Sequence, residues 1–194
     1  MQQAKKHIVI INNFDSFTYN LVHLIHEAGC NDVVVLENNA FEIQDLQHFD
    51  YIVLSPGPGL PGEAGLLKEV IRVYGSCKKI FGVCLGLQAI GQVYGGRLIN
   101  LDTVFHGIRS AIFVTDEEDP VFKGIGTQFE AGRYHSWVID QEDFPQALII
   151  TARDCDGQIM AVRHRDFQVY GVQFHPESYM TSQGIVMMKN FLSL

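Results

Sequence analysis

The chain has 194 residues, of which 47% are apolar, and 22 acidic against 14 basic residues give it a formal net charge of −8. This length predicts a single domain (1–194) with a sizeable hydrophobic core. The acidic balance and the scattered basic residues argue against nucleic acid or an anionic membrane as a partner, and no apolar run is long enough to predict a membrane span.

The first half of the chain alternates predicted strands with predicted helices. Apolar runs and amphipathic periodicity place strands at 7–12, 33–37, 50–55 and 78–84, and helices at 16–28, 62–75 and 85–96. Leu66, Val70 and Val73 are expected to face the core from the second of these helices. Such alternation implies parallel strands joined by right-handed crossovers.

The second half of the chain has a pattern typical of antiparallel strands. Short apolar segments separated by turn signals occur at 109–115, 147–153, 158–164 and 168–174. A short helix is expected at 181–193. Together these patterns predict the α/β class, with a mainly parallel central sheet flanked by helices and additional antiparallel strands in the second half.

The stretch GVCLG, residues 82–86, places a cysteine where a predicted strand meets a predicted helix. It is the thiol counterpart of the G-x-S-x-G elbow, a sharp turn that exposes a nucleophile above the sheet. Gly82 and Gly86 remove Cβ atoms that would collide with the neighbouring strand and helix. The N-terminus of the helix favours a thiolate. We therefore interpret Cys84 as a nucleophile, with a buried structural cysteine as the alternative.

A histidine and a glutamate that could serve this nucleophile lie in VYGVQFHPES, residues 169–178. His175 ends an apolar strand directly before a proline, so it could reach the same sheet edge as Cys84. Glu177, two residues on, would share its face in an extended stretch and could orient the ring. This predicts a nucleophile, base and orienter as in a catalytic triad. The histidines that compete for the role are His7, His23, His26, His48, His106, His135 and His164.

The loop SPGPGLPG, residues 55–62, follows another buried strand and should lie at the same edge of the sheet. Its prolines stiffen it, while Gly57 and Gly59 keep their N–H groups and let a ligand approach closely. A rigid N–H in this loop, together with the Leu85 N–H beside the nucleophile, would suit an oxyanion hole. An ordinary Pro/Gly turn is the alternative.

The cysteines and histidines bear on metals and on the cellular compartment. The four cysteines show no Cys-x-x-Cys spacing, and the eight histidines form no His-x-His or His-x-x-x-His pair with a nearby cysteine. We therefore expect reduced thiols, no disulfide framework and no metal site. The N-terminal apolar run is short and lacks a cleavage site of small residues, so it indicates a strand and favours a cytoplasmic enzyme.

Four motifs together carry a resemblance to a known family. SPGPG, GVCLGLQ, RYHSWVI and GVQFHPES occur in the order found in class I, triad-type glutamine amidotransferases, which the chain resembles from residue 7 to residue 193. NFDSFTYNL (13–21) and VFHGIRS (104–110) are similar to the small subunits of anthranilate synthase and para-aminobenzoate (aminodeoxychorismate) synthase. The resemblance implies a flavodoxin-like fold and the release of ammonia from glutamine.

Roles for individual residues follow from this resemblance. It implies that Cys84 attacks glutamine to form a thioester, with His175 as base and acid and Glu177 as its orienter. The N–H groups of Gly57 and Leu85 would hold the oxyanion. The positions that would bind the substrate are Gly57, Gly59, Gln88, Ser136 and Trp137.

The resemblance also implies a partner. The chain shows no second catalytic constellation, so ammonia would pass to a chorismate-binding subunit that uses Mg²⁺, and this chain itself would need no cofactor. The DSFTYNL and HGIRS segments are candidate contacts, with helix capping by Asp15 or Ser16 as the alternative for the first. Positions that depart from the common family pattern are Leu87, Ile108 and Trp137.

Other classes of function stay open at this point. They are a stand-alone cysteine hydrolase or peptidase, a non-catalytic module that kept the fold, and an amidotransferase for another acceptor such as carbamoyl phosphate or guanylate. The intact triad positions argue against the second, and the short chain with its DSFTYNL motif argues against the third. The motifs do not separate the anthranilate pathway from the para-aminobenzoate pathway.

Overall fold

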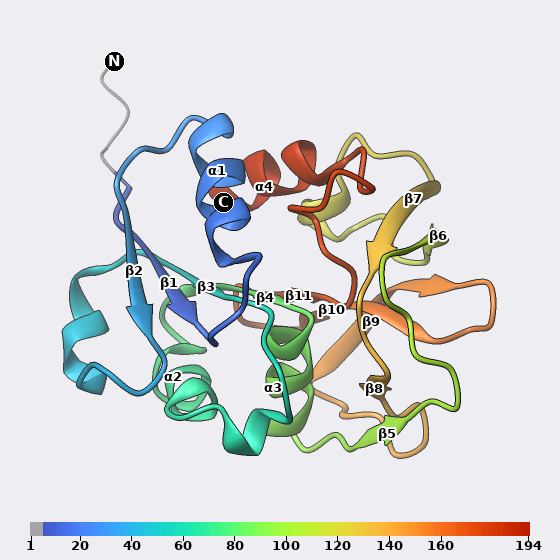
Figure 1. Cartoon of the computed structure of the whole chain (residues 1–194), viewed down its shortest axis with the longest axis horizontal. Helices are drawn as coiled ribbons and strands as arrows, with labels where there is room; N and C mark the ends of the chain where they lie inside the picture. Colours follow the sequence, from blue (N-terminus) through green and yellow to red (C-terminus); the bar gives the residue numbers. More distant parts are fainter. Residues whose placement is uncertain (1–5) are drawn as a thin grey trace.

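The computed structural model describes residues 6–194 and is built around a nine-stranded mixed sheet (Figure 1). The strand order is β2-β1-β3-β4-β11-β10-β9-β6-β7, and a second, two-stranded sheet pairs β5 with β8. Helices α1 and α4 cover one face of the large sheet, and α2 and α3 cover the other. No helix within residues 6–194 is long and apolar enough to cross a bilayer.

The first five strands in this order run parallel to one another. They are β1 (Ile8–Asn12), β2 (Val33–Glu37), β3 (Tyr51–Leu54), β4 (Lys79–Val83) and β11 (Val169–Val172). The helices are α1 (Thr18–Glu27), α2 (Leu67–Tyr74), α3 (Leu85–Val93) and α4 (Gly184–Leu192). Because these strands are parallel, their carboxyl ends meet at one edge of the sheet, where ligands bind in folds of this kind.

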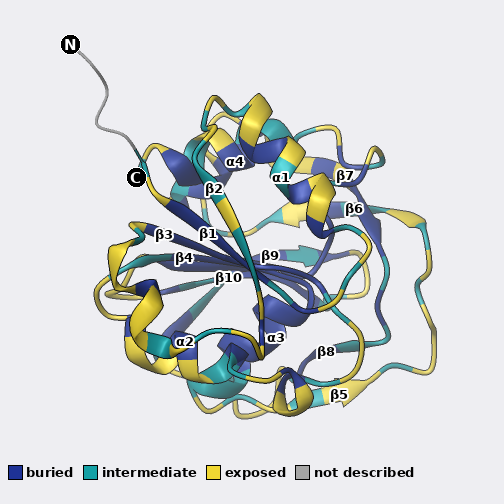
Figure 2. Cartoon of the chain, turned by 60° about the vertical axis from the view of Figure 1, so that its left-hand side comes forward, coloured by how far each residue is buried: buried dark blue, intermediate teal, exposed yellow. Residues whose placement is uncertain are grey.

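Alternation along the central strands builds the two layers of the core. Ile8 and Ile10 of β1 pack with α1 and α4, whereas Val9 and Ile11 pack with α2 and α3. Figure 2 shows the buried central strands between helices that are exposed on their outer sides. Since both faces of the strand are covered, its sequence is a continuous apolar run, as predicted.

The second half of the chain adds antiparallel strands to the same sheet. β10 pairs antiparallel with β11, β9 with β10, β6 with β9, and β7 with β6. These strands are β6 (Ile108–Val114), β7 (Gln128–Arg133), β9 (Leu148–Asp154) and β10 (Ile159–His164). The predicted α/β class with additional antiparallel strands is confirmed.

The prediction of an antiparallel strand at 168–174 was right on one side only. β11 pairs antiparallel with β10 but in parallel with β4, with Gly171 opposite Gly82. The apolar pattern of a strand does not record its direction, which depends on the strand beside it. The correction matters for the site, because β11 now ends at the same sheet edge as β4.

The helix expected at 62–75 begins later than predicted. Pro61–Glu63 forms a 3₁₀ turn, and α2 starts only at Leu67. Gly65 has a positive φ of 52°, and the next N–H donates to Asn38 O at 2.8 Å, so the backbone turns before the helix can start. Two of the predicted core positions of this helix are therefore corrected: Leu66 precedes the helix and is only half-buried, and Val73 is 45% exposed. The side chains of α2 that are buried are Leu67, Val70, Ile71 and Tyr74.

Three strands were not predicted from the sequence. β5 (Leu98–Asn100) and β8 (Trp137–Ile139) pair with each other and are three residues long, too short for a recognisable alternation. β7 carries Gly132, which weakens a strand pattern. The remaining 3₁₀ helices are Ile43–His48 and Pro120–Phe122.

Candidate active site

Cys84 occupies a strained turn between β4 and α3. Its backbone has φ 52° and ψ −100°, and a positive φ is uncommon for a residue with a side chain. A Cβ added to Gly82 would lie 2.6 Å from the Gly86 carbonyl carbon, and one added to Gly86 would lie 2.6 Å from Leu54 O. The flanking glycines therefore permit the close packing that holds this turn, as the sequence predicted.

The Cys84 sulfur is surrounded by groups that stabilise negative charge. Gln173, which is fully buried, donates from Nε2 to Sγ at 3.5 Å. Cys84 is also the N-cap residue of α3, so the free N–H groups and positive dipole end of that helix lie beside it. The Cys84 N–H donates to Val172 O at 2.8 Å, which joins the turn to the end of β11. A side-chain donor and the positive end of a helix dipole therefore both lie next to the sulfur.

His175 is positioned by the neighbouring β7 strand and by a turn. Its N–H donates to Gly132 O at 3.0 Å, and its carbonyl accepts from Thr181 Oγ1 at 2.7 Å. β11 itself ends at Val172, before the strand end expected from the sequence. The ring is therefore carried past the edge of the sheet, toward the turn that holds Cys84.

His175 and Glu177 form a buried pair, with 2.7 Å between Nδ1 and Oε1. The sequence predicted that the two side chains share a face because the stretch would be extended, and this reason was wrong. The stretch is not extended, because the Ser178 N–H donates to His175 O at 3.2 Å and closes a turn. The turn brings the carboxylate to Nδ1 and leaves Nε2 as the nitrogen that faces the sulfur.

The protonation of His175 is coupled to both neighbours. Burial alone lowers its pKa, but the charge of Glu177, the nearby Cys84 sulfur and the hydrogen bond from Nδ1 to Glu177 outweigh burial and raise the pKa to about 10. His175 Nε2 has no well-aligned hydrogen-bond partner within residues 6–194. The Cys84 sulfur is nevertheless close enough to raise the pKa of His175. The raised pKa keeps a protonated His175 ring beside the sulfur, with its Nδ1 side held by Glu177.

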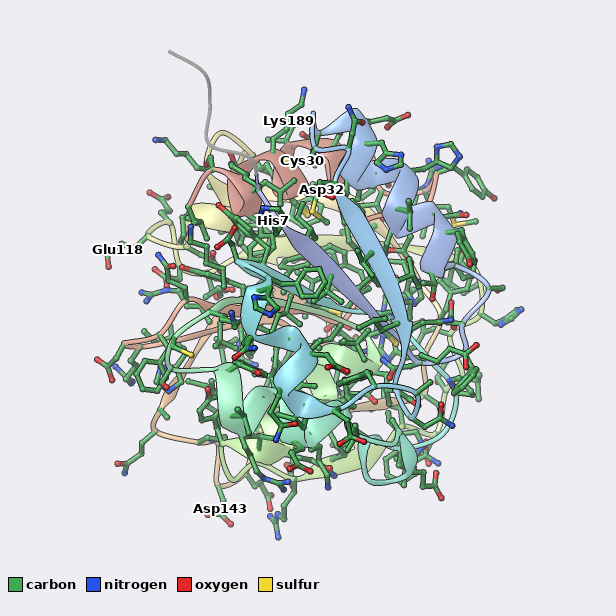
Figure 3. The ribbon with its side chains drawn as sticks, turned by 90° about the vertical axis from the view of Figure 1, so that its left-hand side faces the viewer. His7, Cys30, Asp32, Glu118, Asp143 and Lys189 are labelled. Carbon is green, nitrogen blue, oxygen red and sulfur yellow. The ribbon has the colours of Figure 1, made fainter. Side chains whose placement is uncertain are left out.

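Two of the competing histidines lie away from Cys84. His7 pairs its Nδ1 with Asp32 Oδ2 at 3.0 Å at the amino ends of β1 and β2, the opposite edge of the sheet from Cys84, and Figure 3 shows the pair near Cys30. His164 stacks on Phe167 with 4.3 Å between ring centroids. Among residues 6–194, no three His, Cys, Asp or Glu side chains are grouped as a metal site would require.

The loop after β3 brings Gly57 against the nucleophile turn. A Cβ added to Gly57 would lie 2.9 Å from Leu85 Cδ2, so the two residues predicted to hold an oxyanion are neighbours in space. Leu85 is the first residue of α3, where the N–H has no acceptor within the helix. Gly59 adopts φ 73°, a conformation that a side chain would strain.

A cavity of about 270 Å³ opens at this edge of the sheet. It brings together three segments that are far apart in the sequence, at 57–59, 84–88 and 134–137. The lining residues are Gly57, Pro58, Gly59, Cys84, Gln88, Tyr134, His135, Ser136 and Trp137. Every position predicted to bind substrate therefore lines the same pocket as the nucleophile.

A chain of side-chain amides links the pocket wall to the sulfur. Gln88 Nε2 donates to Trp137 O at 2.9 Å and lies 3.3 Å from Gln173 Oε1. Gln173 in turn donates to Cys84 Sγ. Gln88 thus lies on the pocket side of α3, as predicted, and its amide is already held in one orientation.

His135 is fixed as a neutral ring behind the same wall. Arg133 Nε donates to His135 Nε2 at 3.1 Å, so the ring proton sits on Nδ1, which donates to Trp137 O at 3.1 Å. Burial and then the positive charge of Arg133 lower the pKa of His135 to about 3. Arg133 pairs with Asp154 at 2.7 Å, with both side chains buried. His135 therefore supports the pocket wall and stays neutral near neutral pH, so it does not transfer protons.

Sequence reasoning missed Gln173 and Tyr134 as residues of the site. Gln173 lies two residues before His175 in the same motif, a spacing that could have indicated a shared face. The Tyr134 ring meets the His175 ring edge-on, with 4.8 Å between centroids, and lies 5.0 Å from the Phe17 ring. These ring contacts join segments that are distant in the sequence, so no local pattern predicts them.

The arrangement suits attack by sulfur on a carbonyl carbon. It combines a thiolate-stabilising turn, an imidazole oriented by a carboxylate, and backbone N–H groups at a helix start and a rigid loop. These are the components of cysteine-dependent acyl transfer. The cavity beside them is of a size that admits a small molecule.

Comparison with known proteins identifies the family. Residues 9–194 match the family described as glutamine amidotransferase class-I. The chain belongs to the class I glutamine amidotransferase family. The amidotransferase is 42% identical over 187 residues to aminodeoxychorismate/anthranilate synthase component 2 of Bacillus subtilis (strain 168), covering 95% of each chain. It is 41% identical to aminodeoxychorismate synthase component 2 of Escherichia coli (strain K12), covering 95% of this chain and 98% of that one.

Further relatives agree with these matches. Anthranilate synthase component 2 of Pyropia yezoensis is 43% identical, covering 95% of the amidotransferase and 98% of its own length. The crystal structure of a proposed GMP synthase subunit from Thermoplasma acidophilum superposes with a TM-score of 0.88 at 22% identity, covering 99% of this chain and 94% of that one, which shows the fold. The resemblance inferred from the motifs is confirmed.

Proposed function

We propose that this amidotransferase hydrolyses glutamine at Cys84 and supplies ammonia to a separate chorismate-binding synthase subunit. The observation that carries the first part is the contact of Gln173 and the His175–Glu177 pair with Cys84, whose side chain lines the cavity. The second part is supported by the relatives, which are component 2 subunits of aminodeoxychorismate and anthranilate synthases. We expect Mg²⁺ on the partner and no cofactor on this chain.

The reaction begins when the Cys84 thiolate attacks the side-chain amide carbon of glutamine. The charge that develops on the amide oxygen accepts hydrogen bonds from the Gly57 and Leu85 N–H groups. His175, kept protonated by its raised pKa, donates its Nε2 proton to the amide nitrogen. The C–N bond then breaks, ammonia leaves, and a γ-glutamyl thioester remains on the sulfur. Glu177 keeps the ring oriented throughout.

Water completes the cycle. The neutral His175 ring takes a proton at Nε2 from the water whose oxygen attacks the thioester carbonyl. Collapse of this second tetrahedral species breaks the C–S bond and restores the thiolate and the imidazolium. The product leaves as glutamate after its carboxyl group loses a proton to solvent.

The pocket wall supplies recognition of glutamine. Gly59, Gln88, Ser136 and Trp137 line the cavity next to the nucleophile, and we assign them to binding the substrate. The Trp137 carbonyl is fixed by hydrogen bonds from Gln88 and His135, so the wall is organised before substrate enters. Preorganisation of this kind lowers the entropy cost of binding.

A face near the pocket mouth suits the partner subunit. Tyr19, Val104 and Tyr179 are 66%, 70% and 84% exposed, far more than is usual for large apolar side chains. The Tyr134 ring lies between their segments, 5.0 Å from the Phe17 ring and 6.0 Å from the His106 ring. These ring contacts support a docking face that includes the DSFTYNL and HGIRS regions, where a docked subunit could receive ammonia directly.

A reconstitution experiment tests the proposal. The chain is mixed with an aminodeoxychorismate synthase or anthranilate synthase large subunit, chorismate, Mg²⁺ and glutamine, and the aromatic product is identified. The wild type should form product from glutamine. Cys84→Ser should abolish glutamine-dependent product but leave product formation from added ammonia intact. Product from glutamine with Cys84→Ser would contradict the role of the sulfur, and no coupling to either subunit would contradict the proposed partner.

A stand-alone cysteine hydrolase is the alternative that the nucleophile turn would also allow. It predicts turnover of simple peptides or esters at rates comparable with glutamine. Our proposal predicts glutamate release from glutamine and no turnover of peptides, which a coupled glutamate assay beside a chromogenic peptide assay decides.

A further inference from the structure

Two buried asparagines, Asn13 and Asn38, hold both ends of the loop that carries Gly57 and Gly59. Asn13 follows β1, and Asn38 follows β2, so each stands at the carboxyl edge of the sheet. Both side chains are buried, and Asn38 Nδ2 donates to Asn13 Oδ1 at 3.0 Å. The mechanism above uses neither residue.

Asn13 fixes the start of this loop. Its Nδ2 donates to Ser55 O at 2.8 Å, and its backbone N–H donates to Ser55 Oγ at 2.9 Å. The Ser55 hydroxyl in turn donates to Pro56 O at 2.7 Å. The two peptide units that precede Gly57 are therefore oriented by the side chain and the backbone N–H of Asn13, the second of them through the Ser55 hydroxyl.

Asn38 fixes the end of the loop. Its carbonyl accepts from the Leu66 N–H at 2.8 Å, and a Cβ added to Gly65 would lie 2.5 Å from the same oxygen. The loop from 55 to 66 is thus anchored at its far end on the residue that also hydrogen-bonds Asn13. The side chains of Asn13 and Asn38 hydrogen-bond each other, so the two residues form one connected brace for the loop.

Asn13 also packs directly on Gly57. A Cβ added to Gly57 would lie 2.5 Å from Asn13 Cβ and 2.7 Å from Asn13 O on one side, and 2.9 Å from Leu85 Cδ2 on another. The Gly57 backbone is therefore confined between the asparagine and the first residue of α3. Its freedom to rotate depends on how firmly Asn13 is held.

We propose that Asn13 and Asn38 are positioning residues that orient the Gly57 N–H for the oxyanion. This inference rests on the proposed function, because it requires charge to develop on a substrate oxygen next to Gly57. A donor that is misplaced by about 1 Å can cost on the order of 100-fold in rate. The brace acts on the transition state and makes no contact with glutamine itself.

Asn13→Asp gives the sharpest test. The substitution preserves shape and still accepts from Asn38, but it removes the donor to Ser55 O and places a carboxylate oxygen against that carbonyl. We expect kcat for glutamine hydrolysis to fall by about 10-fold to 100-fold with KM within about threefold. Alkylation of Cys84 by iodoacetamide, followed by peptide mass spectrometry, should be unchanged because that reaction builds no oxyanion.

Asn38→Asp is the second variant, and it removes the side-chain donor to Asn13 Oδ1 but leaves the Asn13 donor to Ser55 O in place. It should lower kcat less than Asn13→Asp, because the start of the loop keeps its hydrogen bond. The matched control is Asn190→Asp, which removes side-chain donors to Val121 O at 3.0 Å and Lys123 O at 2.7 Å far from the pocket. The control should keep wild-type kcat at a comparable loss of thermal stability.

The outcomes separate this inference from the proposed function. Unchanged kcat in Asn13→Asp, or an equal fall in kcat and in Cys84 alkylation, overturns the positioning role while the wild type remains an active glutaminase. A fall in kcat shared by Asn190→Asp overturns it as well, because the effect would then follow stability. A wild type that hydrolyses no glutamine, alone or with a partner subunit, contradicts the proposed function first.

Discussion

At the scale of single residues, the Cys84 sulfur accepts a hydrogen bond that no motif predicted. Gln173 donates to the sulfur from a fully buried position and is oriented by Gln88. A neutral amide can stabilise a thiolate without titrating, so its contribution persists across the pH range in which the enzyme works.

Replacing this amide should slow the chemistry at the sulfur. Gln173→Leu removes the donor to Sγ at similar volume, and we expect the rate of Cys84 alkylation and the kcat for glutamine to fall by about 10-fold each, which corresponds to a charge-assisted hydrogen bond of about 1.4 kcal/mol. The control is Gln92→Leu at the far end of α3, where the amide oxygen accepts from Lys68 at 3.4 Å and lies away from the sulfur. Wild-type alkylation in Gln173→Leu would contradict the role of this bond.

Asp119 is a buried carboxyl whose pKa shift runs opposite to the usual direction. Burial raises its pKa to about 6, and the nearby Thr151 hydroxyl, the hydrogen bond from the Val121 N–H and the charge of Arg163 offset burial only in part. Between about pH 4 and pH 6 the folded state keeps a proton that the unfolded state releases, so this group makes stability decrease as pH rises through that window.

Asp119→Asn should therefore stabilise the protein above pH 6. The amide keeps an acceptor for the Val121 N–H, which now bonds Oδ1 at 2.9 Å, and it carries no charge to desolvate. We expect the free energy of unfolding to rise by up to about 3 kcal/mol at pH 8 and by little at pH 4. Urea unfolding at both pH values measures this, with the exposed Asp143→Asn as a control that changes neither. A loss of stability at pH 8 would show that the carboxylate is paired better than its burial implies.

At the scale of secondary-structure elements, the turn that carries Cys84 packs so tightly that only glycine fits on either side of it. β4, β3 and α3 approach so closely at Gly82 and Gly86 that no side chain fits between them. The strained backbone of Cys84 is held by these contacts, since a positive φ persists only where the surroundings impose it.

Gly86→Ala should destabilise the fold as well as the site. The added methyl group would lie 2.6 Å from Leu54 O and 2.8 Å from Leu54 Cβ, so α3 must move away from β3. We expect a loss of about 1 to 3 kcal/mol or more in the free energy of unfolding, measured by chemical denaturation. Gly126→Ala, where nothing lies within 4 Å, is the matched control and should keep wild-type stability. Equal effects of the two variants would argue against tight packing at the turn.

At the scale of the whole molecule, the antiparallel extension completes the pocket. β7 binds the backbone of His175, and the segment after it supplies the wall formed by residues 134–137. The parallel part of the sheet carries the nucleophile, so the site exists only because both parts belong to one continuous sheet. The exposed apolar side chains lie on segments from both parts as well.

Truncating the most exposed of these side chains should weaken docking without harming the fold. Tyr179 is 84% exposed, and we expect Tyr179→Ala to raise the dissociation constant for the large subunit by about 5-fold to 30-fold, the effect of losing a moderate aromatic contact. Phe113→Ala on β6 is the control for loss of an exposed aromatic side chain elsewhere. Titration calorimetry with the reconstituted subunits measures both, and equal affinities for wild type and Tyr179→Ala would place the interface on another face.

Much of this protein could be predicted from local sequence because the relevant physics is local. The apolar run of β1 follows from burial on both faces, the glycines around Cys84 from the lack of space at the turn, and the order of the motifs from the family to which the chain belongs. Residue type and short spacing are enough to predict a nucleophile, an imidazole and a carboxylate at the ends of strands.

Only the tertiary structure decided which groups meet. The direction of β11, the Gln173 donor and the pair formed by Asn13 and Asn38 all depend on contacts between segments distant along the chain. Such contacts leave no periodic trace, because a hydrogen bond between remote residues constrains their identities but not the pattern around them.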